Sequence, residues 1–212
     1  ISDGRIINNK NDFLHDIKER KEEFNIQNRI TVDDIGTIEI TSSKFFLTGN
    51  TSKDSALNLL NSRLSFKNNC HTIEIKNITI TGKLEFLSNK NVIFDHVIYN
   101  GVFLANNDHT DLISTLQIYN SEFHLSEQNY GFVIQNKDMD IDNATFYGNT
   151  QYNIYLMKFS GQKDTTYNNT LHINDSLFSG NYHNGGIEGY YANITCTNTR
   201  FENFYSGNEL NG

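Results

Sequence analysis

The chain has 212 residues, with 17 Lys and Arg against 25 Asp and Glu, which gives a formal net charge of −8. A charge of this sign argues against nucleic acid or an anionic membrane surface as the partner. The sequence has no Pro, no Trp and 2 Cys, and 32 of its residues are Asn. No Asn homopolymer occurs, so we interpret the excess as the mark of a turn-rich repeat rather than of low-complexity disorder.

An amphipathic helix is predicted near the N-terminus, over residues 11–24. Because the open end of a repeat exposes strand edges and core, we expect this helix to cap the repeat. Residues 1–30 are therefore assigned to the cap and residues 31–212 to the repeat. One face of the predicted helix carries four apolar residues, Phe13, Leu14, Ile17 and Phe24.

An eight-residue pattern recurs seven times. Its first and third positions are apolar, its second and fourth are mostly polar, and its eighth is a large apolar residue, which is typical of strands with one buried face. Two longer intervals between copies indicate insertions near residues 50–62 and 160–170, and the first insertion is predicted to hold a short helix. The copies are residues 38–45, 73–80, 92–99, 116–123, 139–146, 171–178 and 194–201.

The fifth position of the pattern predicts a sharp corner. It is Asp, His or Ser in three copies, and such residues, like Asn, adopt the left-handed backbone conformation more readily than most and bond to their own backbone. Stacked corners would place the Asn side chains in a ladder of amide hydrogen bonds from coil to coil. The four Asn of this predicted ladder are Asn77, Asn120, Asn143 and Asn198.

Short apolar segments that follow Gly or Asn lie between the copies, as in residues 101–104 and 131–134. Three short strands in each coil of about 20 to 25 residues predict an all-β fold, a right-handed parallel β-helix of about seven coils. No cap is recognisable at the C-terminus, so we expect the chain to be part of a longer protein. Cys70 and Cys196 are expected to be lone buried thiols, although a disulfide between them stays open.

The C-terminal third resembles a known family. Residues 178–181 read Phe-Ser-Gly-Asn, residues 185–187 read Gly-Gly-Ile, and residues 198–203 read Asn-Thr-Arg-Phe-Glu-Asn. These strings resemble the F-x-x-N and G-G-A-I repeats of polymorphic-outer-membrane-protein and adhesin-like β-helices, within the pectin-lyase-like superfamily. Glu188 departs from that pattern, which has a small residue there. The resemblance implies a secreted or surface module that holds a protein or a sugar, usually without catalysis.

The abundance of Asn, Ile and Tyr is also similar to the β-helix repeats of large secreted proteins of anaerobic fungi, including cellulosome scaffoldins. That similarity implies a protein partner, as in cohesin-bearing scaffoldins.

A catalytic alternative rests on acidic residues in one predicted strand. Asp138, Asp140 and Asp142 alternate with apolar residues and so project from one face, and His172 is expected beside them on the next coil. A polysaccharide lyase or glycoside hydrolase would use such carboxylates with an acid or base. A solvated strand face explains the same pattern and is favoured. No metal-ligand set, cofactor motif or nucleophile motif is recognisable.

Tyrosines crowd the C-terminal third and predict a binding surface, because Tyr offers a large ring and a hydroxyl to a partner or a sugar. The favoured function is therefore a non-catalytic extracellular binding or scaffold module for a protein or a polysaccharide, without cofactor. No apolar stretch of about 18 residues is present, so no insertion into a membrane is expected. The predicted binding residues are Tyr155, Tyr182, Tyr190, Tyr191 and Tyr205.

Overall fold

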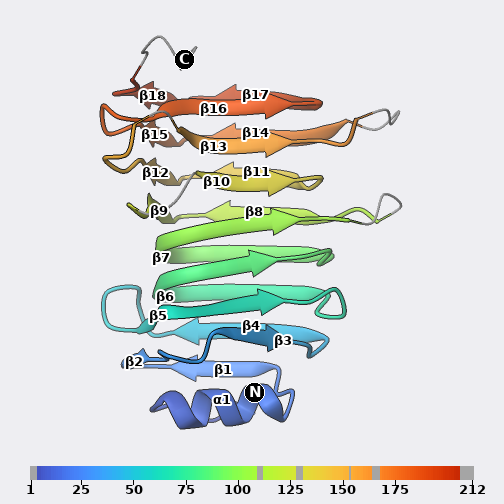
Figure 1. Ribbon diagram of the computed structural model, residues 1–212, viewed down its shortest axis with the longest axis vertical. Coiled ribbons are helices and arrows are strands. Elements are labelled where there is room, and N and C mark those ends of the chain that lie inside the picture. Colours follow the sequence, from blue (N-terminus) through green and yellow to red (C-terminus); the bar gives the residue numbers. More distant parts are fainter. Residues whose placement is uncertain (1–3, 109–111, 128–130, 153, 164–167, 206–212) are drawn as a thin grey trace.

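The chain forms a parallel β-solenoid of about seven turns, capped by one helix (Figure 1). The computed structural model describes residues 4–108, 112–127, 131–152, 154–163 and 168–205. The 18 strands of the described residues belong to one continuous sheet, and they pair in parallel, which confirms the predicted parallel β-helix.

The first seven coils each carry three strand segments and the eighth carries two among the described residues, and equivalent segments of successive coils stack into three columns. The first column contains β1 (Glu23–Ile26), β4 (Lys44–Gly49), the first parts of β6 (Thr72–Phe86) and β7 (Asn91–Asn106), β8 (Thr115–Tyr119), β11 (Asp138–Asp142), β14 (Asn169–Asn174) and β17 (Ala192–Thr197). We number the coils 1 to 8 by these eight strands.

The second column contains β2 (Arg29–Thr31), the first part of β5 (Ala56–Phe66), the middle of β6 and β7, β9 (Glu122–Leu125), β12 (Thr145–Tyr147), β15 (Leu177–Ser179) and β18 (Arg200–Glu202). The third contains β3 (Thr37–Ile40), the last parts of β5, β6 and β7, β10 (Phe132–Gln135), β13 (Tyr155–Ser160) and β16 (Gly185–Tyr190). The first, second and third corners follow the first, second and third columns.

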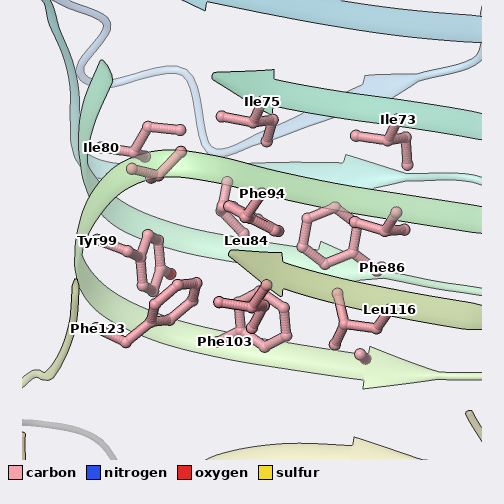
Figure 2. Close-up of a cluster of buried hydrophobic side chains, with 14 of the residues drawn as sticks. Ile73, Ile75, Ile80, Leu84, Phe86, Phe94, Tyr99, Phe103, Leu116 and Phe123 are labelled. Carbon is pink, nitrogen blue, oxygen red and sulfur yellow. The ribbon is translucent and has the colours of Figure 1, made fainter. Parts of the chain in front are cut away.

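Alternate residues of each strand point into the solenoid, as their period of two predicts. Ile75 pairs with Phe94, and the same line continues through the buried Ile118, Ile141 and Ile173. Figure 2 shows side chains of neighbouring coils meeting in this interior, among them Ile75, Phe94 and Phe103. Burial of this stacked apolar surface is the main force that holds the coils together.

A second interior line is aromatic, as predicted from the eighth position of the pattern. Tyr99 and Phe123 have ring centroids 5.4 Å apart, and Phe123 and Phe146 stack at 5.1 Å. Phe146 and Phe178 stack at 4.8 Å, and Phe178 stacks on Phe201 at 5.1 Å. The ring spacing follows the separation of about 4.8 Å between paired strands, so each coil places its ring on the next.

The first corner has the predicted left-handed backbone. Six fifth-position residues have φ between 48° and 56°, and Asn143 donates from Nδ2 to Asn120 Oδ1 at 2.8 Å. Asn120 Nδ2 in turn donates to Asp95 Oδ1 at 3.0 Å, and Asn198 Nδ2 donates to Asp175 Oδ1. The amide ladder is therefore real but broken into two segments. Asn77 shares the φ of 56° without a side-chain hydrogen bond to any residue that the structure describes.

One predicted copy, residues 38–45, is out of register. Ile38 and Ile40 pair with Leu64 and Phe66 in the third column, and Phe45 pairs with Ile73 in the first. The prediction failed because all three columns have the same alternation, so a period of two cannot tell one column from another.

The capping helix α1 is Lys10–Lys18, shorter than the predicted 11–24. It ends because Arg20 adopts φ 54° and the N–H of Lys21 donates to the carbonyl of Asp16, an arrangement that terminates helices. Phe24 instead belongs to β1, where its ring lies 5.6 Å from that of Phe13. The solenoid thus begins inside the segment assigned to the cap, and α1 covers its first coil (Figure 1).

The first predicted insertion holds no helix. Residues 56–66 form strand β5, in which Leu57 and Leu59 are buried and Leu60 is exposed with φ 48°. The long interval arose from the misplaced first copy. The second insertion, near residues 160–170, includes residues 164–167, which lie outside the described residues.

A buried polar chain at the third corner was not predicted. Lys137, which is 0% exposed, donates from Nζ to Leu87 O and to Ser114 Oγ, each at 2.7 Å. Ser114 donates to the carbonyl of Asn89, and Asn89 donates to the carbonyl of Cys70 at 2.7 Å. No acidic group among the described residues pairs with the buried ammonium, and burial lowers the pKa of Lys137 to about 7.

Both cysteines are free, as expected, but only Cys70 is buried, and burial raises its pKa to about 12. Cys196 lies on the inner line of coil 8 and is exposed. Ile194 and Phe201 of the same coil are each 40% exposed. Coil 8 therefore exposes interior positions whose equivalents in the earlier coils are buried under the following coil.

Candidate functional site

The acidic residues of the catalytic alternative lie on the outer face of the first column. Asp140 pairs in register with His172, as predicted, and Asp142 pairs with Asn174. All three predicted residues, Asp140, Asp142 and His172, are exposed. On the other side of β11, Asp142 faces Tyr119. The face thus holds two carboxylates and one imidazole in open solvent.

The electrostatics of this face act mainly on Tyr119. Partial burial raises the pKa of Tyr119, and the nearby charges of Asp140, Asp142 and Asp95 raise it further. Among the described residues, no group of three or more His, Cys, Asp and Glu is arranged to hold a metal ion. None of the three grooves described for this surface is lined by Asp140, Asp142 or His172.

The predicted tyrosines do not form one surface. Tyr155 begins β13 and Tyr190 ends β16 on the outer face of the third column, where a hydrogen bond with Glu188 raises the pKa of Tyr190. Lys158 Nζ lies 5.8 Å from the centre of the Tyr190 ring. Tyr191 turns away at the third corner with φ 49° and is 53% exposed.

Three aromatic rings lie together at the second corner of coils 6 to 8. Tyr152 lies 4.4 Å from His183 and 5.1 Å from Tyr205, measured between ring centroids. We call these three residues the aromatic cluster. Tyr152 is 53% exposed, and the other two rings are partly exposed. Three loops from three successive coils therefore present aromatic surface at one solvent-facing corner.

A buried pair of Asn side chains holds these loops. Asn184 Oδ1 accepts from the N–H of Asn149 at 2.8 Å, and Asn184 Nδ2 donates to Gln151 O at 2.8 Å. Asn149 donates to the carbonyl of Ser126 at 2.6 Å, and the N–H of Tyr205 donates to Asn184 O at 2.9 Å. Asn149 is 2% and Asn184 0% exposed. Buried hydrogen bonds of this kind fix the loops, and with them the rings, in one arrangement.

Part of this site is predictable from the sequence. Tyr205 was predicted to bind, and Tyr182 is a near neighbour of His183 in the chain, with φ 60° and 67% exposure. The roles of His183 and of the Asn149–Asn184 pair were missed. One sequence feature pointed to the pair: Asn149 follows Gly148 and Asn184 precedes Gly185, in the segments that join the second and third strands of their coils. The general excess of Asn concealed it.

Comparison with known proteins adds no assignment. The chain matches no family model, no curated protein and no solved structure. Within the described residues, no helix has the length and apolarity needed to cross a membrane. What is established is a parallel β-solenoid repeat protein, with the aromatic cluster at its second corner.

Proposed function

We propose that this chain is a non-catalytic extracellular binding module that holds a polysaccharide at the aromatic cluster of the second corner. The observation that carries the proposal is the contact of Tyr152 with His183 and Tyr205 at an exposed corner. Contiguous exposed apolar surface often marks an interaction site, and aromatic faces suit the apolar faces of sugar rings.

Two further features support this reading. The buried Asn149–Asn184 pair orders the loops before any ligand arrives, which lowers the entropy cost of binding. The resemblance to adhesin-like and pectin-lyase-like β-helices, and the compositional similarity to scaffoldin repeats, favour a secreted or surface location. They also favour a binding role over catalysis. A protein partner at Tyr155, Tyr190 and Tyr191 remains the predicted competitor.

The proposal is tested by retention on insoluble polysaccharides, with cellulose, xylan, mannan, chitin and pectin as the panel. We expect the wild type to be retained by at least one of them and Tyr152→Ala to lose at least about tenfold in affinity, since one aromatic anchor commonly contributes more than 1 kcal/mol. Tyr191→Ala is the matched control because both rings are 53% exposed.

The outcomes separate the two surfaces. Retention that survives Tyr152→Ala but is lost in Tyr191→Ala would move the site to the third corner and contradict the proposal. Failure of all five polysaccharides to retain the wild type would also contradict it.

A hydrolase or lyase on the outer face of the first column is the second candidate. The register pairing of Asp140 with His172 is the observation that favours it. Turnover of any of the soluble polysaccharides pectin, alginate and glucan by the wild type would replace the binding proposal if the triple variant D140A/D142A/H172A abolishes it. We expect no turnover, because these side chains are exposed and line none of the three grooves described above.

A further inference from the structure

A groove lined by both polar and apolar groups hollows the second corner of coils 1 to 5, on the same edge of the solenoid as the aromatic cluster. Its volume is about 770 Å³, and its lining comes from five successive coils, including Gly36, Arg63, Lys83, Asn100 and Ser126. Four coil spacings of about 4.8 Å make this groove about 19 Å long, parallel to the solenoid axis. Grooves of this kind accept extended chains rather than compact ligands.

The floor of the groove is backbone because the corner has glycine where other corners have side chains. Gly82 and Gly101 pair in register, with φ of 137° and 153°. A Cβ on Gly101 would collide with the carbonyl oxygen of Gly82. Strands β6 and β7 therefore run through the corner without a loop, and their backbones pack closely against each other and against Leu59 there.

Several side chains that line the groove have unused hydrogen-bonding capacity. Thr81, Lys83 and Asn100 make no side-chain hydrogen bond or ion pair with any residue in the described part of the chain, and each is half-buried. Arg63 is instead engaged, since it donates to Thr37 at 3.1 Å and lies 3.3 Å from Glu85. The groove thus offers hydroxyl, amide and ammonium groups to a ligand while only one cation is unpaired.

One hydrogen bond links the coil 5 end of the groove to the loops of the aromatic cluster. Ser126 lines that end of the groove, and the carbonyl of Ser126 accepts the hydrogen bond from Asn149, one coil further on. Tyr152 follows in the same loop as Asn149. One edge of the solenoid therefore carries polar groups along coils 1 to 5 and aromatic rings along coils 6 to 8.

We infer that a neutral linear polysaccharide lies along this edge, with one end of the bound segment on the aromatic cluster and the following sugars in the groove. This inference rests on the proposed function. The spacing of the coils is comparable with the length of one sugar in an extended chain, so equivalent side chains of successive coils meet successive sugars. The net charge of −8 and the pairing of Arg63 with Glu85 disfavour a polyanion.

The test is calorimetric titration with oligosaccharides cut from whichever polysaccharide retains the wild type. A disaccharide reaches only the aromatic cluster, whereas a hexasaccharide also enters the groove, so we expect the hexasaccharide to bind about tenfold more tightly. The double variant Thr81→Ala/Asn100→Ala should lose most of that gain and leave disaccharide affinity unchanged. Asn174→Ala, which removes an exposed Asn from the first column, is the control and should change neither affinity.

Each outcome decides a different claim. Equal affinity of the two oligosaccharides, or a double variant that keeps the full hexasaccharide affinity, overturns the groove while the aromatic site stands. Tighter binding of a carboxylated or sulfated hexasaccharide than of the neutral one also overturns it. If no polysaccharide retains the wild type, or if Tyr152→Ala leaves the affinity for both oligosaccharides intact, the proposed function itself fails and the groove inference fails with it.

Discussion

The first and second corners of the solenoid both turn the chain from one strand column to the next, but they do so with different residues. The first turns at one residue in every coil from 3 to 8, with φ between 48° and 56°, and its polar side chains are mostly exposed. The second runs straight through Gly82 and Gly101 in coils 3 and 4 and becomes a loop in coils 6 to 8. The regular corner sets the spacing of the coils, and the irregular one provides the space and the loops where a ligand can be held.

The largest expected effect tests the glycine floor of the second corner. Gly101→Ala should cost roughly 4 kcal/mol or more of the free energy of unfolding, because the new methyl group meets the backbone of Gly82, which cannot move without disturbing the sheet. Gly36→Ala is the matched control in open space with φ 77° and should cost only about 1 kcal/mol. Urea unfolding followed by circular dichroism measures both. Equal costs would show that the floor is not close-packed.

The next effect extends the comparison to the third corner, where the polar groups lie inside. Lys137→Met should raise the free energy of unfolding at pH 6 by about 3 kcal/mol, because a buried ammonium without a counter-charge is replaced by an apolar chain.

The same variant has a pH signature. The pKa of Lys137 is about 7 in the folded protein and 10.5 in the unfolded chain. Between these values the unfolded state binds more protons, so wild-type stability should rise with pH by up to about 1.4 kcal/mol per unit. Lys137→Met should lack this rise between pH 7 and pH 9. A variant and a wild type with parallel stability profiles would mean that the lysine titrates normally.

A smaller effect probes the loops that hold the aromatic cluster. Asn184→Ala should lower the free energy of unfolding by about 2 kcal/mol, because it leaves the buried N–H of Asn149 without its acceptor. Retention on polysaccharide should fall as well, since the rings of His183 and Tyr205 lose their support. Asn174→Ala, which removes an exposed Asn side chain from the first column, is the control. Loss of stability with full retention would separate the pair from the site.

The smallest effect is expected at the first corner. Asn143→Ala should cost about 1 kcal/mol, because Ala disfavours φ 52° and loses the hydrogen bond to Asn120. Asn143→Gly keeps the backbone conformation and should cost less. Thermal unfolding of the pair measures the difference. If Gly and Ala cost the same, the hydrogen bond that both variants lose, rather than the backbone conformation, would govern this corner.

Sequence reasoning succeeded where one residue type repeats a local task. The left-handed φ of Asn120 and Asn143 follows from their own chemistry, and the inner ladders follow from alternation along each strand. It failed where the outcome depends on a distant partner. The copy at residues 38–45 was misplaced because register is set by the neighbouring coil. The helix was predicted too long because Phe24 pairs in strand β1 instead.

The candidate site was predicted only in part for the same reason. Tyr205 could be chosen as an exposed ring, but its contact with Tyr152 depends on two loops in different coils. Buried Asn149 and Asn184 look like any other Asn in a chain that has 32 of them. From the sequence alone Lys137 would be placed at the surface, whereas the fold buries it completely.

Lys137 also bears on how the solenoid comes apart. In a stack where each coil touches only its neighbours, unfolding proceeds in short independent steps. The hydrogen bond from Lys137 to Leu87 spans 50 residues and joins the third corners of coils 3 and 5, passing over coil 4. Coils 3 to 5 are thereby tied into one cooperative unit, and hydrogen exchange should find them opening together while coil 8 exchanges by itself.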